Sequence, residues 1–350
     1  RSRDEGLTWE TISPDLTAND PKRQMVSGAP ITRDVTGEEY YSTLYSVAES
    51  PVTAGVIWAG ANDGPVHATR DGGRTWTNVT PRGLPPEGRV QTVAPSPHQA
   101  GKAYVSVLRY MLQDWRPYVY RTSDYGATWQ KITAGIPDSV PVRVVREDPL
   151  REGLLWAGTE GGMYVSFDDG ARWQPFQLNL PATPVTDLTF ARNDLVLSTM
   201  GRGFWILDDR TLVAQLEGGR VDVSAPRVFA PATAIRTRYR TFGGAAGGPE
   251  YPPVGAWIDY ALPEGFSGPA VLEIRDASDR VVRRLTSAAP AEDDMLAAGT
   301  SRIPATPGHH RIRWDLSHPG AWDASAARRG RNGPMVAPGR YRVVLLAGDA

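Results

Sequence analysis

Two adjacent carboxylates, Asp168 and Asp169, stand beside Gly170 in the segment Ser-Phe-Asp-Asp-Gly-Ala-Arg-Trp, residues 166–173. Acids next to a glycine are typical of calcium loops, and paired acids also carry out glycoside hydrolysis. The calcium-loop spacing D-x-[DN]-x-[DN]-G with a distal Glu is absent here. The segment therefore needs a different explanation.

The same eight-residue pattern, [S/T]-x-D-x-G-x-[T/R]-W, occurs four times, and we call each copy an octet. The hydroxyl and the carboxylate are suited to accept backbone N–H groups of a hairpin turn, and the glycine suits a positive φ. The tryptophan is expected to pack beneath the turn. A catalytic pair is needed once, whereas a structural turn is needed in every repeat. We therefore predict a structural role, without a catalytic residue, metal or cofactor. The pattern residues are Ser2, Asp4, Gly6, Trp9, Thr69, Asp71, Gly73, Trp76, Thr122, Asp124, Gly126, Trp129, Ser166, Asp168, Gly170 and Trp173.

The composition excludes several classes of protein. A net charge of −1 over 350 residues gives no electrostatic argument for nucleic acid, and we predict no such partner. The absence of cysteine excludes a disulfide scaffold and thiol chemistry. The 36 glycines and 30 prolines suit short strands joined by many turns. No apolar run reaches membrane-spanning length, and no signal peptide is visible.

Each octet lies within a unit of about 40–50 residues, which is typical of β-propeller blades with four antiparallel strands. The order is strand, Ser-Pro or Asp-Pro turn, strand, loop, strand, octet, strand. The predicted first strands are Leu44–Ala48, Val90–Ala94 and Val142–Arg146, and the second strands are Val56–Gly60, Ala103–Val107 and Leu154–Gly158.

A fifth unit over residues 194–208 has lost the octet, because Ile206 takes the place of Ser166 and Arg210 that of Gly170. Terminal repeats are often atypical in this way. Counting a partial first unit, we predict four to five four-stranded blades over residues 1–220, as the C-terminal blades of a larger propeller. The first edge strand needs a partner.

The composition changes after Leu216. Residues 221–249 are predicted to form a connector that includes a glycine-rich break. Residues 250–350 are predicted to form a small β-sandwich of immunoglobulin or fibronectin type. Its expected strands are Ala256–Tyr260, Ala270–Arg275, Val281–Leu285, Gly308–Trp314 and Gly339–Leu346. The whole chain is thus predicted to be all-β.

The octets resemble the Asp-box, or BNR repeat, of sialidases, sortilin-type receptors, xyloglucanases and photosystem assembly-factor propellers. The runs VIWAGANDGPVHATRDGGRTWTNVTP, SFDDGARW, GRGFWILDD and PGRYRVVLLAGD are similar to large bacterial BNR-repeat proteins labelled sortilin-like or glycosyl-hydrolase-like. This resemblance implies a periplasmic or extracellular multi-propeller protein with a C-terminal β-sandwich. The export signal is expected in a part that precedes residue 1. No activity is implied, because such labels rest on fold analogy.

The enzyme families in this group match poorly. The Arg-Ile-Pro motif of sialidases occurs only at residues 302–304, in the predicted sandwich. Sortilin-type receptors carry a cysteine-rich module, which a chain without cysteine does not contain. The related bacterial proteins have Thr-His-Gly-Arg in the last blade, where this chain has Met200 in place of the histidine.

The candidate binding residues lie on loops opposite the octet turns. Residues 108–118 form a longer loop than their counterparts at 62–64 and 160–162. Aromatic, methionine and arginine side chains on a long loop suit contact with protein or sugar, although such a loop also suits covering an edge or a neighbouring domain. The candidates are Tyr110, Met111, Trp115, Arg116 and Arg202.

Three other groups favour structural roles. Trp58 and Trp156 occupy one repeat position, which indicates packing between blades rather than sugar stacking. Asp208 is expected to be a turn residue like Asp168. His309 and His310 point to opposite faces of a strand and so do not share a metal.

We therefore favour a non-catalytic interaction or scaffolding propeller, a subunit or assembly factor of a larger, membrane-associated complex. Its expected partners are other subunits or the rest of its own polypeptide. The alternative is part of a carbohydrate-active enzyme, related to sialidases or glycoside hydrolases, with catalytic residues partly outside this segment and carbohydrate as ligand.

Overall fold

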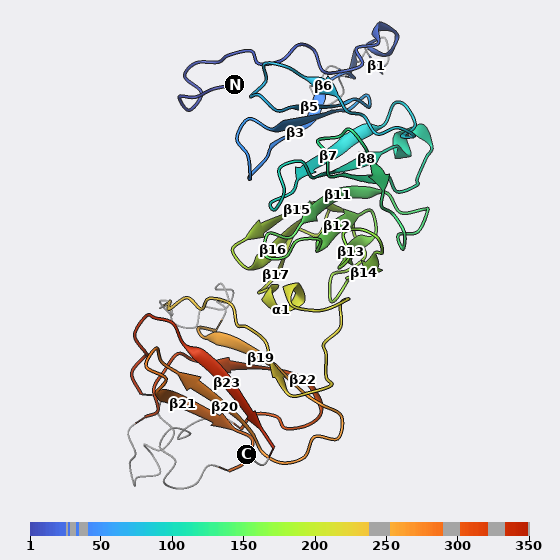
Figure 1. Cartoon of the computed structure of the whole chain (residues 1–350). Helices are drawn as coiled ribbons and strands as arrows, with labels where there is room; N and C mark the ends of the chain where they lie inside the picture. Colours follow the sequence, from blue (N-terminus) through green and yellow to red (C-terminus); the bar gives the residue numbers. More distant parts are fainter. Residues whose placement is uncertain are drawn as a thin grey trace. The chain divides into compact units, whose positions relative to one another are not determined.

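The computed structural model describes residues 1–25, 27–28, 33–34, 41–237, 253–289, 302–320 and 333–348. The chain forms two compact units, residues 1–208 and 209–350, and strands dominate both (Figure 1). The predicted all-β class is confirmed. The longest helix in the described ranges, α1 (Thr211–Ala214), has four residues, and none of their helices is long enough to cross a membrane.

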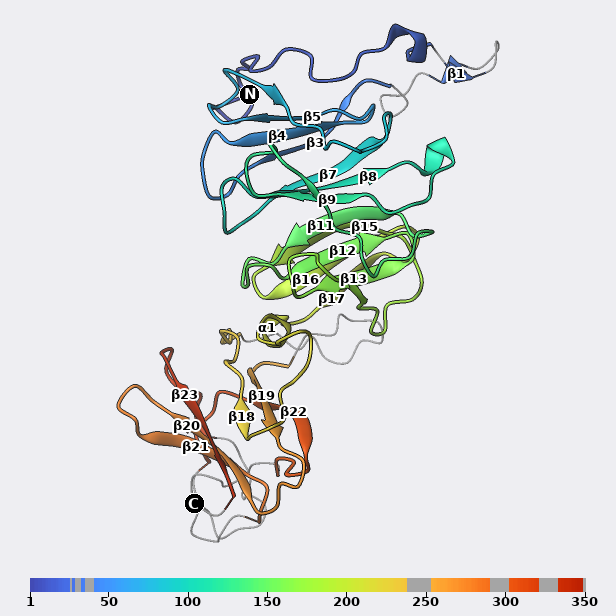
Figure 2. The ribbon, with the colours of Figure 1, turned by 45° about the vertical axis from the view of Figure 1, so that its right-hand side comes forward.

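In the described part of the first unit, four antiparallel sheets of three or four strands follow one another in chain order (Figure 2). We number them blades 1 to 4, as the predicted propeller blades. Blade 1 has β3 (Leu44–Glu49), β4 (Ile57–Ala61), β5 (Val66–Thr69) and β6 (Thr77–Asn78); blade 2 has β7 (Arg89–Pro95), β8 (Ala103–Leu108), β9 (Val119–Thr122) and β10 (Gln130–Lys131). Blade 3 has β11 (Val142–Glu147), β12 (Leu155–Thr159), β13 (Gly162–Ser166) and β14 (Gln174–Pro175); blade 4 has β15 (Val185–Ala191), β16 (Asp194–Thr199) and β17 (Phe204–Leu207). A small hairpin of β1 (Ser27–Gly28) and β2 (Arg33–Asp34) precedes them, after a 3₁₀ turn, η1 (Pro21–Arg23).

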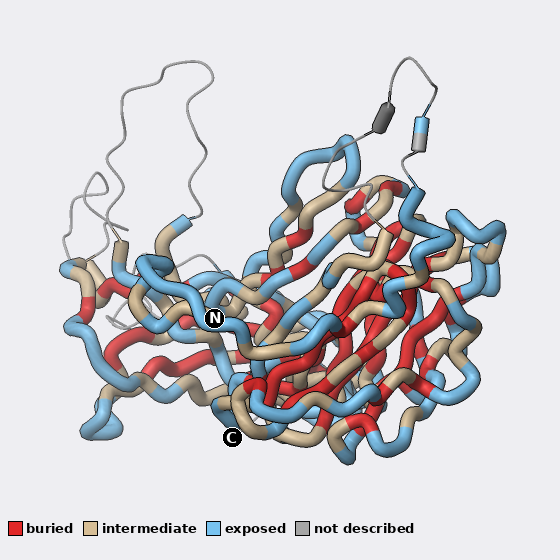
Figure 3. The backbone as a smooth tube through the Cα atoms, turned by 90° about the horizontal axis from the view of Figure 1, so that it is seen from above, coloured by how far each residue is buried: buried red, intermediate tan, exposed pale blue. Residues whose placement is uncertain are grey.

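The second strands of blades 1, 2 and 3 are buried on both of their faces. Every residue of β4, β8 and β12 is buried, in keeping with their mostly apolar sequences. Figure 3 shows long buried stretches of the chain in red. The first strand of the following blade covers one face of each, because β7 packs on β3 and β4, β11 on β7 and β8, and β15 on β11 and β12. The blades therefore build one continuous core from one sheet to the next.

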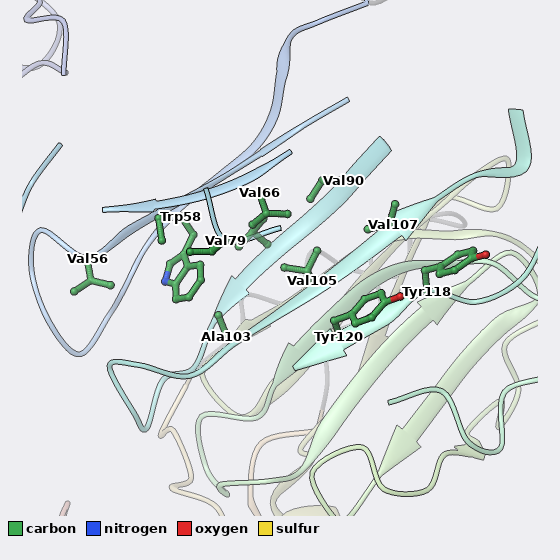
Figure 4. Close-up of a cluster of buried hydrophobic side chains, with 12 residues drawn as sticks. Val56, Trp58, Val66, Val79, Val90, Ala103, Val105, Val107, Tyr118 and Tyr120 are labelled. Atoms are coloured by element: carbon green, nitrogen blue, oxygen red, sulfur yellow. The ribbon is translucent and has the colours of Figure 1, made fainter. Parts of the chain in front are cut away.

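Small residues let adjacent blades approach closely. A Cβ atom added to Gly60 of blade 1 would lie 2.3 Å from Val90 Cγ1 of blade 2. A Cβ atom on Gly158 of blade 3 would lie 2.7 Å from Val185 Cγ1 of blade 4. Figure 4 shows the core beside the first contact, where Trp58 lies among buried valines of blades 1 and 2. The glycines thus accept the first strand of the following blade.

The four octets have the same hydrogen bonds. The hydroxyl accepts from the glycine N–H at 2.7–3.0 Å in every copy. The carboxylate accepts from the backbone N–H four residues later at 2.9 Å in every copy. Each octet is thus a closed turn that satisfies its own backbone donors.

Three of the octet tryptophans also tie their blade to the preceding segment of the array. The indole Nε1 of Trp76 donates to Ile12 O at 2.8 Å, that of Trp129 to Val79 O at 2.7 Å, and that of Trp173 to Ile132 O at 2.8 Å. Each acceptor lies three residues beyond the preceding octet tryptophan. We call this bond the indole clasp.

For Trp9 the expectation of a packed indole is wrong. This side chain is 77% exposed, and its Nε1 donates to Gly6 O within its own octet at 3.2 Å. No preceding sheet lies against it among the residues that the structure describes.

The register of blade 4 corrects the predicted alignment by one residue. Leu207 stands opposite Leu195, as Ser166 stands opposite Leu155 in blade 3. Leu207, rather than Ile206, therefore takes the position of the octet hydroxyl. The turn is lost in either alignment, because a leucine cannot accept the backbone N–H groups.

The second unit contains two three-stranded sheets that share one core. One sheet has β18 (Arg227–Val228), β19 (Ala256–Leu262) and β22 (Gly308–Trp314), and the other β21 (Val281–Thr286), β20 (Ala270–Arg275) and β23 (Arg342–Ala347). Their inner faces meet around Ile258, Leu272 and Trp314. The five strands predicted here are confirmed, while the immunoglobulin type of this sandwich stays a prediction.

The indole clasp predicts a measurable cost for its removal. Trp173→Phe leaves the Ile132 carbonyl without its buried donor. We expect the free energy of unfolding of the first unit, from urea denaturation, to fall by about 1–3 kcal/mol. Trp115→Phe, at an exposed indole, is the control and should change it by less than about 0.5 kcal/mol. Equal effects would contradict the clasp.

The octet carboxylates predict a dependence on acid. Hydrogen bonds from the Thr128 side chain and backbone lower the pKa of Asp124 below its ordinary value of 3.8. A pKa lowered by folding stabilises the protein above 3.8, and this stabilisation is lost as the pH falls below that value. Asp124→Asn should therefore be less stable than the parent at neutral pH, and the difference should shrink below pH 3.8.

Urea denaturation at a series of pH values measures this difference, with the exposed Asp138→Asn as the control. A difference between parent and Asp124→Asn that stays constant with pH would contradict the assigned role of the carboxylate.

Candidate functional site

The β8–β9 loop, residues 109–118, has a fixed internal structure. It begins with a 3₁₀ turn, η2 (Tyr110–Leu112), which projects at the edge of blade 2 (Figure 2). Gln113 follows in the left-handed region, with φ of 62°. The backbones of Arg109 and Asp114 then pair in an antiparallel bridge that closes the loop.

Asp114 holds three side chains of this loop together. Its carboxylate accepts from Arg116 Nε at 2.9 Å, from Tyr118 Oη at 2.7 Å and from Arg109 Nε at 3.2 Å. The hydrogen bond from Arg116 is the main cause that lowers the pKa of Asp114. Burial, followed by the bond to Asp114, raises the pKa of Tyr118 to about 12. The carboxylate therefore stays ionised at neutral pH and keeps the loop in one conformation.

The outer surface of this loop is apolar and aromatic. The rings of Tyr110 and Trp115 pack 5.8 Å apart, tilted by 32°. Met111 and Trp115 are 63% and 52% exposed, although both are large apolar side chains. Arg109 anchors the loop to a neighbouring one through Nη1, which donates to Pro85 O at 2.9 Å. We call Tyr110, Met111 and Trp115 the aromatic loop patch.

The structure brings together four of the five predicted binding residues: Tyr110, Met111, Trp115 and Arg116 share this loop. Arg202 is exposed in the β16–β17 loop, two blades further along the array, and is not part of the patch. Sequence analysis missed the supporting residue Asp114. One signal in the sequence could have indicated its supporting role: an acid, Asp114, stands between two arginines, Arg109 and Arg116, in one short loop.

The acidic residues in the loops between the second and third strands of blades 1 to 3 already have hydrogen-bond or ion-pair partners. Glu160 pairs with Arg143 at 2.7 Å, and Asp63 accepts the N–H of Ala18 at 2.9 Å. Together with Asp114, they give three carboxylates bound to donors of the chain itself.

In the octet at residues 166–173, the second acid, Asp169, belongs to a different contact from the turn. Asp169 accepts from Tyr104 Oη at 2.6 Å and pairs with Lys102 Nζ at 3.1 Å and Arg121 at 2.7 Å. Lys102 also pairs with the buried Glu147 at 2.9 Å. Burial raises the pKa of Tyr104, which stays a donor. This ion cluster joins blades 2 and 3. Of the adjacent acids Asp168 and Asp169, the first thus forms the octet turn and the second forms this contact between blades.

The remaining candidates have structural surroundings. Trp58 and Trp156 are fully buried and offer no surface to a sugar. His309 Nε2 contacts Asp259 Oδ1 at 2.8 Å, whereas His310 Nε2 contacts Thr306 O at 2.7 Å. Within the ranges given above, no group of three or more His, Asp or Glu side chains is placed to hold a metal ion.

No family model matches the chain. An oligoxyloglucan-reducing end-specific xyloglucanase from Emericella nidulans is 26% identical over 119 residues, which are 33% of this chain and 14% of that protein. The chain thus matches a small part of the length of this curated relative.

Two solved structures are among those similar to this chain. YCF48 bound to a D1 peptide has 17% identity and a TM-score of 0.37, covering 70% of this chain and 69% of that one. The GH74 xyloglucanase from Xanthomonas campestris has 15% identity and a TM-score of 0.39, covering 63% and 40%.

The ion cluster between blades 2 and 3 predicts a large effect of one substitution. Lys102→Met leaves the Glu147 carboxylate buried beside an apolar side chain. We expect the free energy of unfolding to fall by about 3–5 kcal/mol, because a buried charge loses its partner. The double variant Lys102→Met/Glu147→Leu should recover most of this loss. The exposed Lys22→Met is the control. A single variant as stable as the control would contradict the structural role of the cluster.

Proposed function

We propose that this chain is a non-catalytic interaction propeller that binds a protein partner through the aromatic loop patch, as a subunit or assembly factor of a larger complex. The observation that carries the proposal is a rigid loop that keeps large apolar side chains in solvent. Soluble proteins rarely gather such side chains without a partner.

The residue types suit a protein interface. Tyrosine, tryptophan and arginine dominate the binding energy of protein interfaces, and methionine adapts to irregular apolar surfaces. Because Asp114 already fixes the loop, binding loses little conformational entropy of the loop. We expect a partner segment with an apolar or aromatic side chain that contacts Met111 and Trp115.

A carbohydrate-active protein is the second candidate, favoured by the sequence match to a xyloglucanase. An aromatic patch also stacks on sugar rings. In this candidate the catalytic acids lie partly outside this segment. Exposure of the chain to the periplasm or the cell exterior belongs to both candidates and stays a prediction.

Site-specific photo-cross-linking tests the first candidate. A photoreactive phenylalanine analogue is placed at position 115 of the chain in the cell that makes it, and at position 150 as a matched exposed control. We expect one cross-linked polypeptide at position 115 that is absent at position 150. The cross-link should be lost in Met111→Asp, which leaves the core of the blade unchanged. Equal labelling at both positions would contradict the proposal.

Incubation with xyloglucan oligosaccharides separates the two candidates. The interaction propeller should release no new reducing ends, and Trp115→Ala should not change the migration of the protein in a xyloglucan affinity gel. Retardation that disappears in Trp115→Ala would favour carbohydrate as the ligand of the patch.

A further inference from the structure

The indole of Trp173 fills a socket between blades 2 and 3. It donates the clasp to Ile132 O at 2.8 Å, and the backbone N–H of Trp173 donates to Ala134 O at 2.8 Å. The ring packs in a buried apolar cluster to which both blades contribute. We call the walls around it the filled socket, and they include Val119, Ile132, Ile136, Leu155 and Ala157.

An open apolar pocket lies at the equivalent place between blades 3 and 4. Strand register and distance from the preceding octet tryptophan pair five of its wall residues with those of the filled socket. The pairs are Met163 with Val119, Phe176 with Ile132, Leu180 with Ile136, Leu195 with Leu155, and Leu197 with Ala157. The pocket therefore has the walls of a tryptophan socket, and we call it the blade 4 socket.

The hydrogen-bond acceptor of the blade 4 socket has no donor among the described residues. The three clasps end on Ile12 O, Val79 O and Ile132 O, each three residues after an octet tryptophan. Phe176 O is the next in this series, and it accepts no hydrogen bond from the part of the chain that the structure describes. Blade 4 has no octet of its own, because Leu207 stands at the hydroxyl position. A carbonyl at an apolar pocket calls for a donor that is carried on an apolar ring.

The strand beside this socket also has an open edge. In blades 1 to 3 the octet tryptophan leads directly into the fourth strand, which pairs with the third. Within the described ranges no fourth strand pairs with β17, and the chain continues into α1 of the second unit. Leu178 and Ile206, which line the socket, are 69% and 58% exposed. The socket, its acceptor and the strand edge thus lie together on one exposed apolar surface.

We propose that a strand from a partner protein completes blade 4. The partner segment is extended and carries a tryptophan whose ring enters the blade 4 socket and whose indole N–H donates to Phe176 O. The two residues after this tryptophan pair with β17 in antiparallel fashion, opposite Ile206 and Trp205. Within blade 3, Gln174 and Pro175 pair in the same way with Val165 and Tyr164.

A polypeptide strand is the occupant because main-chain groups and an indole are needed at the same place. An open strand edge offers N–H and C=O groups with which an extended peptide pairs. The indole combines a large apolar ring with a single N–H donor, as the socket and Phe176 O require. The clasps of this chain use the same combination, so the surface continues an interface that already joins the blades.

This surface lies two blades from the aromatic loop patch. The two proposals therefore concern different partner contacts and fail independently.

Fluorescence anisotropy with a labelled peptide tests the completion of blade 4. The probe is residues 122–133, which contain the octet and the fourth strand of blade 2, and it should bind the whole chain saturably. Trp129→Ala in the peptide should weaken binding by about 30-fold or more, because the central ring is lost. Naphthylalanine at this position keeps a fused ring without the N–H and should weaken binding by about 3–10-fold. No binding of the parent peptide, or equal binding of all three peptides, would overturn the proposal.

Substitutions in the chain locate the peptide. Leu178→Asp and Ile206→Asp should each weaken binding by about tenfold or more, because a carboxylate then faces the apolar ring or the added strand. Both side chains are exposed, so neither change disturbs the fold. The exposed Leu150→Asp is the matched control and should bind the peptide as the parent chain does. Equal affinity of these three variants would contradict the location.

Hydrogen exchange tests the strand pairing itself. Binding of the peptide should slow the exchange of backbone amides in Phe204–Leu207 by about tenfold or more, because the open edge of β17 gains hydrogen bonds. The amides of β9, which is already paired on both sides, are the reference and should not change. Saturable binding that leaves the exchange of β17 unchanged would overturn the added strand.

Discussion

The indole clasp is the interaction on which the array of blades depends. A two-stranded or strongly twisted small sheet is marginal in water by itself, and the fourth strands here have two residues each. The clasps of Trp129 and Trp173 each place a large apolar ring between two sheets, and that of Trp76 places its ring between blade 1 and the N-terminal segment. Each indole uses its single donor on a backbone carbonyl that would otherwise be buried without a partner. The octet turn fixes the position of the tryptophan, and the preceding segment of the chain supplies the carbonyl that accepts its hydrogen bond.

The other contacts between blades follow from this close approach. Gly60 and Gly158 provide the space for the next first strand, since a side chain there would overlap its valines. The ion cluster of Lys102, Arg121, Glu147 and Asp169 crosses between blades 2 and 3 and pairs two cations with two carboxylates. The octet turns and the clasps lie along one edge of the array. The hairpin loops at other edges take no part in them. The aromatic loop patch lies on such a loop.

Much of the fold could be predicted from the sequence because the octet is local and repeated. Its hydroxyl, acid, glycine and tryptophan set the turn, and the flanking apolar runs give the strands. The acceptor of each clasp could not be predicted in the same way. Ile132 O and Trp173 are 41 residues apart, and only the packed sheets bring them together.

The errors have similar physical causes. Trp9 is exposed because burial of an octet indole requires a preceding blade, which its own sequence does not reveal. The alignment of blade 4 shifted by one residue because hairpin register depends on pairing across strands. In the candidate site, the exposed residues were predictable from loop length and residue type. Asp114 was missed because its role appears only when Arg109, Arg116 and Tyr118 are seen around one carboxylate.

Hydrogen exchange of the indole N–H groups, followed by NMR with assigned tryptophan resonances, tests the clasp most directly. The account predicts that the indole protons of Trp76, Trp129 and Trp173 exchange slowly, because release requires the separation of each blade from the segment that precedes it. The indole proton of Trp115, exposed on its loop, should exchange rapidly. Exchange of all four at the same rapid rate would show that the indoles do not join the blades, and would contradict the account.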